Sequence, residues 1–269
     1  MDFKNIKIIF SDLDGTLLNS DRQLPDKNVE AIEAVQKKGI IFVAATARPE
    51  RAISEYCAKV TFDGVISLNG AQVHFKDKRI DNGMSYETSK RIIGALCEKD
   101  NKIVVLETSE GIYSNTIIPD WFVDKKDDLL EVIKTCTVFK ILVIGKNNKF
   151  VEKTREEDTL ITFDEIHEEV ESLMDDKAYY SISENWIHQI MAKTDTKWNA
   201  VCEVLETLGI SKDEALYFGD DNDDVESIGN IGFGIAMGNA IPRAKEASCL
   251  VIGRNDDAGV AEFLRKNIL

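Results

Sequence analysis

Short apolar runs that each end at a polar, glycine-containing turn constrain the fold of this chain more than any other feature. IKIIF (6–10) is followed by SDLDGT, IIFVAAT (40–46) by ARP, and GVISLNG (64–70) ends in a turn of its own. Short runs that are apolar throughout are typical of strands buried on both faces. The intervening segments carry the apolar stripe, early proline and closing glycine of helices. This alternation predicts an α/β fold with a doubly wound, Rossmann-like parallel sheet.

The same alternation returns near the C-terminus, after a middle segment of different character. Its strands are ALYFG (215–219), GFGIAM (232–237) and CLVIG (249–253), and its helices cover about 197–208, 240–247 and a stretch that ends near 264. The middle segment mixes charged amphipathic helices with paired strands, one pair turning at Glu184-Asn185. We therefore expect a core domain of residues 1–81 and 184–269, interrupted by an inserted α/β domain at 82–183.

Composition limits the partners of the chain. Of its 269 residues 43% are hydrophobic and 30% charged, and the formal net charge is −15. Such a charge repels nucleic acids and anionic membranes, so neither is an expected partner. The N-terminus lacks the apolar region of a signal peptide, and the five scattered cysteines indicate reduced thiols, most of them buried. We expect a cytoplasmic protein, and the sequence carries no signal for its oligomeric state.

Two acidic turns follow strands of the predicted sheet. Asp12 and Asp14 come after the first strand, and DDNDD (220–224) follows ALYFG. Because ligands bind beyond the carboxyl ends of strands in open parallel sheets, Asp12, Asp14 and Asp220 converge if these strands are neighbours. Oxygen ligands without His or Cys favour Mg²⁺, and the run lacks the spacing of a calcium-binding EF-hand loop. Taken alone, each turn is equally well interpreted as an Asx-turn or a solvated acidic turn.

Two further positions suit an anion. Thr46 ends the second strand just before a helix that opens at Pro49, and Arg48 adds a cation beside it. Lys197 opens a later helix, where the helix dipole disfavours a positive charge, so a nearby anionic partner is indicated. The alternatives, a plain helix N-cap at Thr46 and a solvated side chain at Lys197, are as common.

Two groups of ring-bearing side chains have structural interpretations. His188 alternates with Trp186 and Ile190 on one face of a strand, and we expect a buried histidine with satisfied hydrogen bonds rather than a catalytic one. Trp121 and Phe122 are expected to pack in a small apolar cluster of the inserted domain.

Taken in order, these positions resemble the motifs of the haloacid dehalogenase superfamily of phosphatases, and more narrowly its Cof-type subfamily with a large α/β cap domain. DLDGT (12–16) matches the first motif, Thr46 the second, Lys197 the third and GDDNDD (219–224) the fourth. The stretches SLNGA and GIAMGNA are also typical of the subfamily. The resemblance covers nearly the whole chain, and this combination of motifs in this order is specific.

The resemblance implies a Mg²⁺-dependent phosphomonoester hydrolase that acts on a small phosphorylated metabolite, such as a sugar phosphate. Asp12 is the implied nucleophile, which forms an aspartyl-phosphate, and Asp14 is the implied general acid and base. The implied sets are Asp12, Asp14 and Asp220 for the metal, Thr46, Lys197, Arg48 and Asn69 for phosphate, and Asp224 and Asp223 as a supporting shell. The cap, at 82–183, sets substrate specificity in this interpretation.

Three residues depart from the family's pattern, and other functions fit parts of it; one of the three, Ser227, stands where methionine is common and concerns packing only. Asp223 stands where the family favours asparagine, and Trp198 where glycine is common. An extra carboxylate at Asp223 would raise the demand for metal or weaken phosphate binding. The alternatives are a phosphotransferase or phosphomutase of the same superfamily, a signalling receiver domain that shares the order Asp, Thr, Lys, and a catalytically inactive binding protein.

Overall fold

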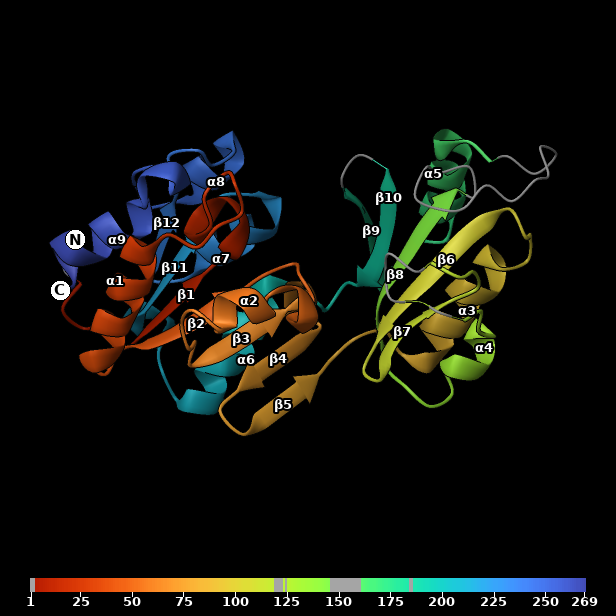
Figure 1. Cartoon of the computed structure of the whole chain (residues 1–269), viewed down its shortest axis with the longest axis horizontal. Coiled ribbons are helices and arrows are strands. Elements are labelled where there is room, and N and C mark those ends of the chain that lie inside the picture. Colours follow the sequence, from red (N-terminus) through yellow and green to blue (C-terminus); the bar gives the residue numbers. More distant parts are fainter. Residues whose placement is uncertain (1–2, 119–122, 124, 146–160, 184–185) are drawn as a thin grey trace. The chain divides into compact units, whose positions relative to one another are not determined.

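The computed structural model describes residues 3–118, 123, 125–145, 161–183 and 186–269 (Figure 1). The chain divides into two compact units, the first made of Met1–Ile80 and Thr196–Leu269 and the second of Asp81–Asp195. The expected cluster at Trp121 and Phe122 and the expected turn at Glu184-Asn185 lie outside the described residues.

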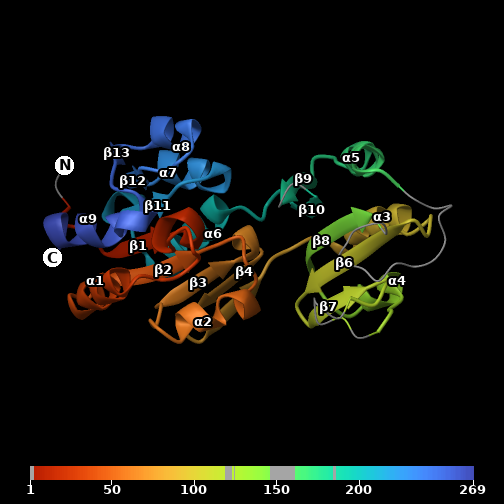
Figure 2. The same cartoon turned by 45° about the horizontal axis from the view of Figure 1, so that its top comes forward.

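The first unit is built on an eight-stranded sheet in the order β13-β12-β11-β1-β2-β3-β4-β5 (Figure 2). Neighbouring strands from β13 to β3 run parallel, and β4 is antiparallel to β3. The strands are β1 (Ile8–Ser11), β2 (Ile41–Ala45), β3 (Gly64–Ser67), β4 (Gln72–Phe75), β5 (Lys78–Asp81), β11 (Ala215–Gly219), β12 (Phe233–Ala236) and β13 (Leu250–Val251). The predicted fold class, α/β with a parallel-dominated sheet, is confirmed. Strands β4 and β5, which extend the sheet beyond β3, are absent from the predicted pattern, because QVHF has only four residues and KRID has a single apolar residue.

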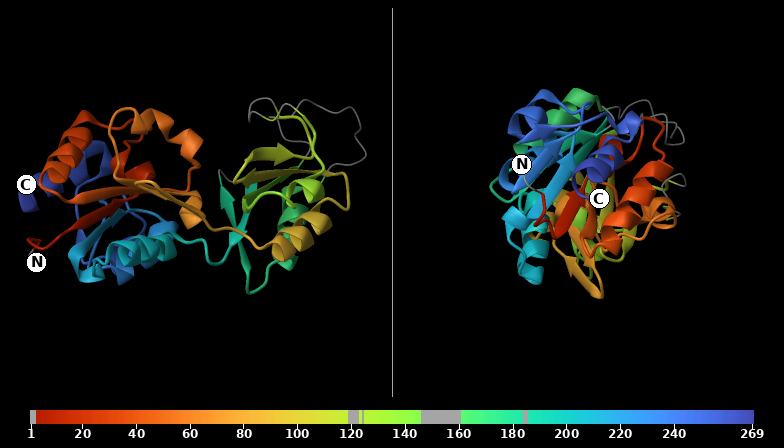
Figure 3. Two further views of the ribbon diagram at one scale, coloured as in Figure 1. Left: turned by 90° about the horizontal axis from the view of Figure 1, so that it is seen from below. Right: turned by 90° about the vertical axis from the view of Figure 1, so that its left-hand side faces the viewer.

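Helices cover both faces of this sheet. They are α1 (Asp26–Lys37), α2 (Ser54–Cys57), α6 (Lys197–Leu208), α7 (Val225–Asn230), α8 (Pro242–Ala247) and α9 (Gly259–Asn267). Helix α1 packs against α9, α7 packs against α6 and α8, and Figure 3 shows α1 and α6 on opposite faces of the sheet. The central strands bury Phe10, Phe42 and Phe218 completely. Each such side chain contributes about 1.5–3 kcal/mol of hydrophobic stabilisation, which holds the strand ends in fixed positions.

The second unit has its own antiparallel sheet, in the order β7-β6-β8-β10-β9, and its own apolar core. Its strands are β6 (Lys102–Thr108), β7 (Gly111–Ser114), β8 (Val138–Gly145), β9 (Ala178–Ser183) and β10 (Ile187–Ala192), and its helices α3 (Tyr86–Leu96), α4 (Leu129–Val132) and α5 (Phe163–Ser172). Because β10 pairs with both β8 and β9, this unit continues to Asp195, past the expected boundary at residue 183. None of the helices in the described ranges is long and apolar enough to cross a membrane.

Two expectations about burial are wrong. All five cysteines are free thiols, but none is fully buried, and Cys57 and Cys249 are exposed. Cys249 precedes β13, a short edge strand whose residues are themselves exposed. His188 is fully buried, yet neither ring nitrogen has a hydrogen-bond partner within the described chain. Its ring stacks on Phe163 instead, with 4.4 Å between centroids.

Candidate active site

The pairing of β1 with β11 brings two acidic turns to one edge of the sheet. The strands are parallel neighbours, with Ser11 opposite Phe218. The amide of Asp12 extends the ladder by donating to the Phe218 carbonyl at 2.9 Å. Carboxylate oxygens of Asp12, Asp220 and Asp224 consequently lie within 4.8 Å of one another. We call these three residues the acidic cluster.

Lys197 is the cation of the acidic cluster. Its Nζ donates to Asp12 Oδ1 at 2.7 Å and to Asp224 Oδ1 at 2.8 Å, and the residue is only 4% exposed. Burial by itself lowers the pKa of Lys197, but the two carboxylates outweigh that effect and raise it well above its usual value. The ammonium group therefore stays charged. Lys197 is not a solvated side chain, and the anionic partners that its position in the helix indicates are these two carboxylates.

The turn after β3 allows α6 to bring Lys197 to the strand ends. Leu68 and Asn69 adopt left-handed backbone angles, with φ of 51° and 56°, and Gly70 follows with φ of 104°. A Cβ atom on Gly70 would overlap the carbonyl of Thr196, the residue just before α6. Glycine is needed at this position because the helix start approaches so closely.

Both carboxylate oxygens of Asp224 accept two hydrogen bonds each. Its Oδ1 accepts from Lys197 Nζ and the Tyr217 hydroxyl, at 2.8 and 2.7 Å, and its Oδ2 from the amides of Asp220 and Asp221, at 2.9 and 3.1 Å. A carboxylate offers about four lone-pair positions, so Asp224 orients its neighbours and has little capacity left for a metal. Burial, followed by the charge of Asp224, raises the pKa of Tyr217 well above its usual value, which keeps the phenol protonated as a donor.

Asp220 is positioned by the tight turn after Asp12. Its Oδ1 accepts from Thr16 Oγ1 at 2.8 Å. Gly15 has φ of 78°, and a Cβ atom there would overlap Asp220 Oδ2, so the turn closes around the carboxylate only with glycine at this position. Burial is the main reason that the pKa of Asp220 rises to about 7; Asp224 adds to the rise and the Thr16 hydrogen bond opposes it.

The charges of the cluster fit a divalent cation. Burial raises the pKa of Asp12 well above its usual value, Lys197 opposes the rise, and Asp224 and Asp220 add to it. Three carboxylates thus share one ammonium group, which leaves their negative charge only partly compensated. The donors are all hard oxygens, the ligand type that Mg²⁺ prefers. Asp12 and Asp220 fit such an ion, whereas the oxygens of Asp224 are already engaged.

Asp14 and Arg48 form a pair outside the acidic cluster. Arg48 Nε and Nη2 each donate to a carboxylate oxygen of Asp14 at 2.6 Å, and the Asp14 side chain is 47% exposed. The hydrogen bonds that Arg48 donates to Asp14 raise the pKa of Arg48. The sequence predicts that the guanidinium group of Arg48 lies near a bound anion. In this structure it binds the carboxylate of Asp14 instead.

Thr46 and Asn69 lie at neighbouring strand ends. Thr46 is 1% exposed, and its Oγ1 accepts from the Arg48 amide at 3.1 Å. The Asn69 amide accepts no hydrogen bond through Oδ1 from any described residue, while its Nδ2 donates to Asp223 Oδ2 at 2.8 Å. Asp223 is exposed and is not a member of the acidic cluster, and Asp221 is exposed as well.

Sequence reasoning did not assign three residues that shape the site. Thr16 and Tyr217 bind members of the cluster, and Asn239 Nδ2 donates to the Gly15 carbonyl at 2.8 Å. Asn239 lies in the stretch GIAMGNA, and the resemblance of this stretch to the family's sequences could have indicated that Asn239 belongs to the site. Tyr217 is part of an apolar strand, where a tyrosine is normally interpreted as a core residue.

Comparisons with known proteins identify the family. A family model described as haloacid dehalogenase-like hydrolase matches residues 9–264, a span that includes the acidic cluster and Lys197. The chain belongs to the haloacid dehalogenase-like hydrolase family. The predicted resemblance to phosphatases of this superfamily is confirmed, and the protein is an enzyme. A receiver domain no longer accounts for the chain, because the hydrolase model extends over both units.

Relatives of this haloacid dehalogenase-like hydrolase match over nearly their whole length. The 5-amino-6-(5-phospho-D-ribitylamino)uracil phosphatase YcsE of Bacillus subtilis is 25% identical over 276 residues, which cover 98% of this chain and 97% of the relative. The solved structure of TM0651 from Thermotoga maritima has a TM-score of 0.82 at 25% identity and covers 97% of each chain. A haloacid dehalogenase-like hydrolase from Bacteroides thetaiotaomicron has a TM-score of 0.80 at 22% identity, covering 97% of this chain and 99% of that chain, which shows the shared fold.

Proposed function

We propose that this hydrolase removes phosphate from a small phosphorylated metabolite, with Mg²⁺ as cofactor and Asp12 as nucleophile. The observation that carries the proposal is the buried carboxylate of Asp12, held by Lys197 beside Asp220 at the ends of two parallel strands. Relatives support the substrate class, since YcsE is named for a small phosphorylated compound. Five free thiols fit the reducing conditions of the cytoplasm, the proposed location.

The residues divide the reaction into two steps. A carboxylate oxygen of Asp12 bonds to phosphorus as the bond from phosphorus to the leaving oxygen breaks, and Asp14 gives that oxygen a proton. Asp14 then takes a proton from water, which attacks the aspartyl-phosphate and releases phosphate. Lys197 orients Asp12 and offsets negative charge as the two anions approach. Asp12, Asp220 and the Asp14 carbonyl would hold Mg²⁺, which would supply further positive charge.

Phosphate binding would draw on groups that are paired in this structure. Thr46 and Lys197 lie at the strand ends and suit phosphate oxygens, as proposed from the sequence. Arg48 can contribute only if its pair with Asp14 opens, and Asn69 only if its amide leaves Asp223. If these two pairs open, Arg48 and Asn69 bind phosphate oxygens. Asp224 and Asp223 are proposed to orient the residues around them.

The second unit is proposed to select the substrate. It packs a separate sheet around a core of its own, so its surface can vary without disturbing the acidic cluster. This assigns the cap role to Asp81–Asp195, a slightly longer segment than the 82–183 expected from sequence.

Hydrolysis of p-nitrophenyl phosphate tests the proposal. We expect Asp12→Asn to lower kcat/KM by at least about 10³-fold, because it removes the nucleophile, and EDTA to abolish activity until Mg²⁺ is restored. The matched control is Asp221→Asn, an exposed acid next to Asp220, which should stay within about twofold of the parent. Undiminished activity in Asp12→Asn would refute the mechanism. Phosphate recovered on added glucose rather than in solution would identify the phosphotransferase alternative.

A further inference from the structure

Tyr217 carries a hydroxyl group into the middle of an apolar strand, and the proposed reaction assigns it no step. It is the largest of the fully buried side chains in the described part of the chain, and its register partners are Phe10 of β1 and Gly234 of β12. A phenylalanine would fill the same space, and a buried hydroxyl costs stability unless it has a partner. The Tyr217 hydroxyl donates to Asp224 Oδ1 at 2.7 Å. That carboxylate therefore accounts for the hydroxyl.

Asp224 is held so that it cannot turn away from Tyr217. A Cβ atom on Gly219, at the end of β11, would lie only 2.5 Å from Asp224 Cγ, which shows how closely this carboxylate packs on the strand. Two backbone amides hold its Oδ2, at 2.9 and 3.1 Å. Its Oδ1 therefore stays directed at Tyr217 and Lys197. Because Asp224 and Tyr217 are both 0% exposed, solvent does not replace the phenol as a donor.

The ammonium group of Lys197 is divided almost equally between two carboxylates. Its Nζ lies 2.8 Å from Asp224 Oδ1 and 2.7 Å from Asp12 Oδ1, and Lys197 is only 4% exposed. Charges interact strongly where water is excluded, so a small change of charge density on Asp224 shifts this balance. The Tyr217 hydroxyl binds the same Oδ1 as Nζ and draws charge density from it. It thus weakens the hold of Asp224 on Lys197.

We propose that Tyr217 is a positioning residue, which acts through Asp224 to keep Lys197 available to Asp12 and to the phosphate group of the substrate. This inference rests on the proposed function, in which Lys197 offsets negative charge as two anions approach. Burial raises the pKa of Tyr217 well above its usual value, so the phenol stays protonated and remains a donor at neutral pH. Without the hydroxyl, Asp224 keeps more of its charge, binds Lys197 more strongly and competes with phosphate for it.

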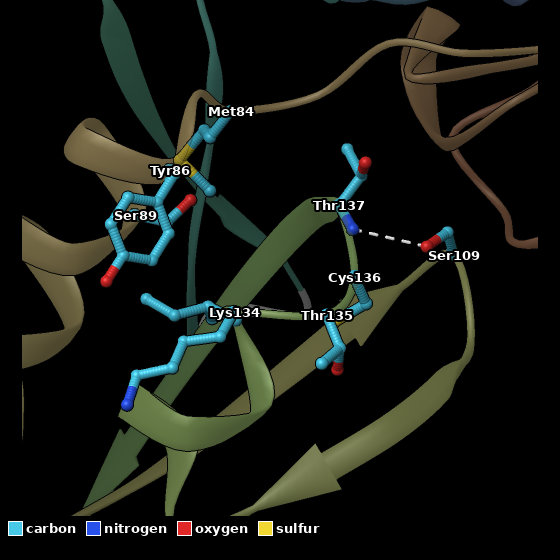
Figure 4. Close-up of a pocket in the computed structure, with 9 residues that line it drawn as sticks. Met84, Tyr86, Ser89, Ser109, Lys134, Thr135, Cys136 and Thr137 are labelled. Carbon is cyan, nitrogen blue, oxygen red and sulfur yellow. Dashed lines mark hydrogen bonds between the residues drawn. The ribbon is translucent and has the colours of Figure 1, made fainter.

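Binding of inorganic phosphate to the full-length protein in the presence of Mg²⁺, followed by phosphorus NMR, tests this role without turnover. We expect Tyr217→Phe to raise the Kd of phosphate about three- to tenfold, a change of the size of one ordinary hydrogen bond. Tyr86→Phe is the matched control. Tyr86 is 41% exposed and lines a depression of the second unit, and none of the described residues around that depression carries a carboxylate (Figure 4). This variant should bind phosphate as the parent does.

A second variant keeps the hydroxyl and changes the strength of its hydrogen bond. Tyr217→meta-fluorotyrosine is a stronger donor of nearly the same size, so it should bind phosphate at least as tightly as the parent. A side chain that only fills space would not separate the two variants in this way. Equal Kd values in the parent and Tyr217→Phe, or weaker binding in both variants, would overturn the inference. Loss of hydrolysis in Asp12→Asn tests the phosphatase proposal separately, so the two failures are distinguishable.

Discussion

Asp223 and Asp224 are adjacent in the chain but have opposite surroundings. Asp224 is fully buried and accepts four hydrogen bonds, two of them from Lys197 and Tyr217. Asp223 is exposed and accepts from Asn69. At the residue scale, burial and partners therefore separate two acids that the sequence presents as equivalents.

The same substitution at these two positions should give different results. Asp223→Asn keeps a carbonyl oxygen for Asn69 and removes a charge outside the acidic cluster, so we expect kcat/KM to change by less than about threefold. Asp224→Asn removes one partner of a buried ion pair and should destabilise the first unit by about 3 kcal/mol. Urea unfolding followed by Trp198 fluorescence, together with p-nitrophenyl phosphate hydrolysis, measures both. A large activity change in Asp223→Asn would instead make this carboxylate a functional group.

His188 should make the second unit sensitive to acid. Burial, with the neighbouring His167, lowers the pKa of His188 to about 4, whereas an unfolded histidine titrates near 6.5. Between these values the unfolded state binds more protons, so His188 makes stability fall as the pH is lowered from about 6.5 to 4. Hydrogen exchange of amides in β8 and β10, corrected for intrinsic rates, measures this contribution.

A matched variant isolates the histidine. Burial raises the pKa of Asp195 to about 6, and a buried acid of raised pKa gains stability as the pH falls, the opposite sign. His188→Phe keeps the stacking with Phe163 and Tyr180 but cannot titrate. We expect this variant to lose less stability than the parent between pH 7 and pH 5. Equal losses in the two proteins would contradict the assignment.

At the scale of elements, the turns that leave β1 and β3 matter as much as the strands. Gly15 closes the first turn around Asp220, and Gly70 lets the start of α6 approach the second turn. Both positions have positive φ, and both lack room for a Cβ atom. These glycines set the positions of Asp220 and Lys197 without taking part in any chemistry themselves.

Gly15→Ala should therefore affect activity as well as stability. Its positive φ and the overlap with Asp220 should cost at least about 1 kcal/mol of folding stability, and displacement of Asp220 should raise the Mg²⁺ concentration required for half-maximal hydrolysis. Gly39→Ala is the matched control, since Gly39 has φ of 82° in the same unit with nothing within 4 Å of its Cβ position. It should lose similar backbone stability and keep its Mg²⁺ dependence. If both variants need more Mg²⁺ for half-maximal hydrolysis, the effect comes from lost stability and not from the position of Asp220.

At the scale of the whole molecule, the two units have separate sheets and separate cores. A cation bound by Asp12 and Asp220 would stabilise only the first unit. At a Mg²⁺ concentration one hundred times the Kd, the gain is about 2.7 kcal/mol. Hydrogen exchange should slow in β1 and β11 and stay unchanged in β6 and β8. Equal protection of both units, or protection that persists in Asp220→Asn, would place the cation elsewhere.

Local patterns predicted the central strands, because each apolar run is short, continuous and ended by a turn, as at IKIIF and ALYFG. They failed for β4, whose four residues are too few to establish a period, and for β5, which has one apolar residue. They also failed for the surroundings of His188 and the cysteines, which depend on distant segments.

Consecutive residues were enough to predict the central strands, the family and the candidate acids, since each of these is encoded in a short stretch of the chain. The surroundings of each acid depend on the tertiary fold. Lys197 contacts Asp12 across 185 positions of the chain, Thr16 contacts Asp220 across 204, and Arg48 contacts Asp14 across 34. Charges interact through space and through the dielectric around them. Burial and partner distances, which no local pattern contains, therefore separate the buried acids from the solvated ones.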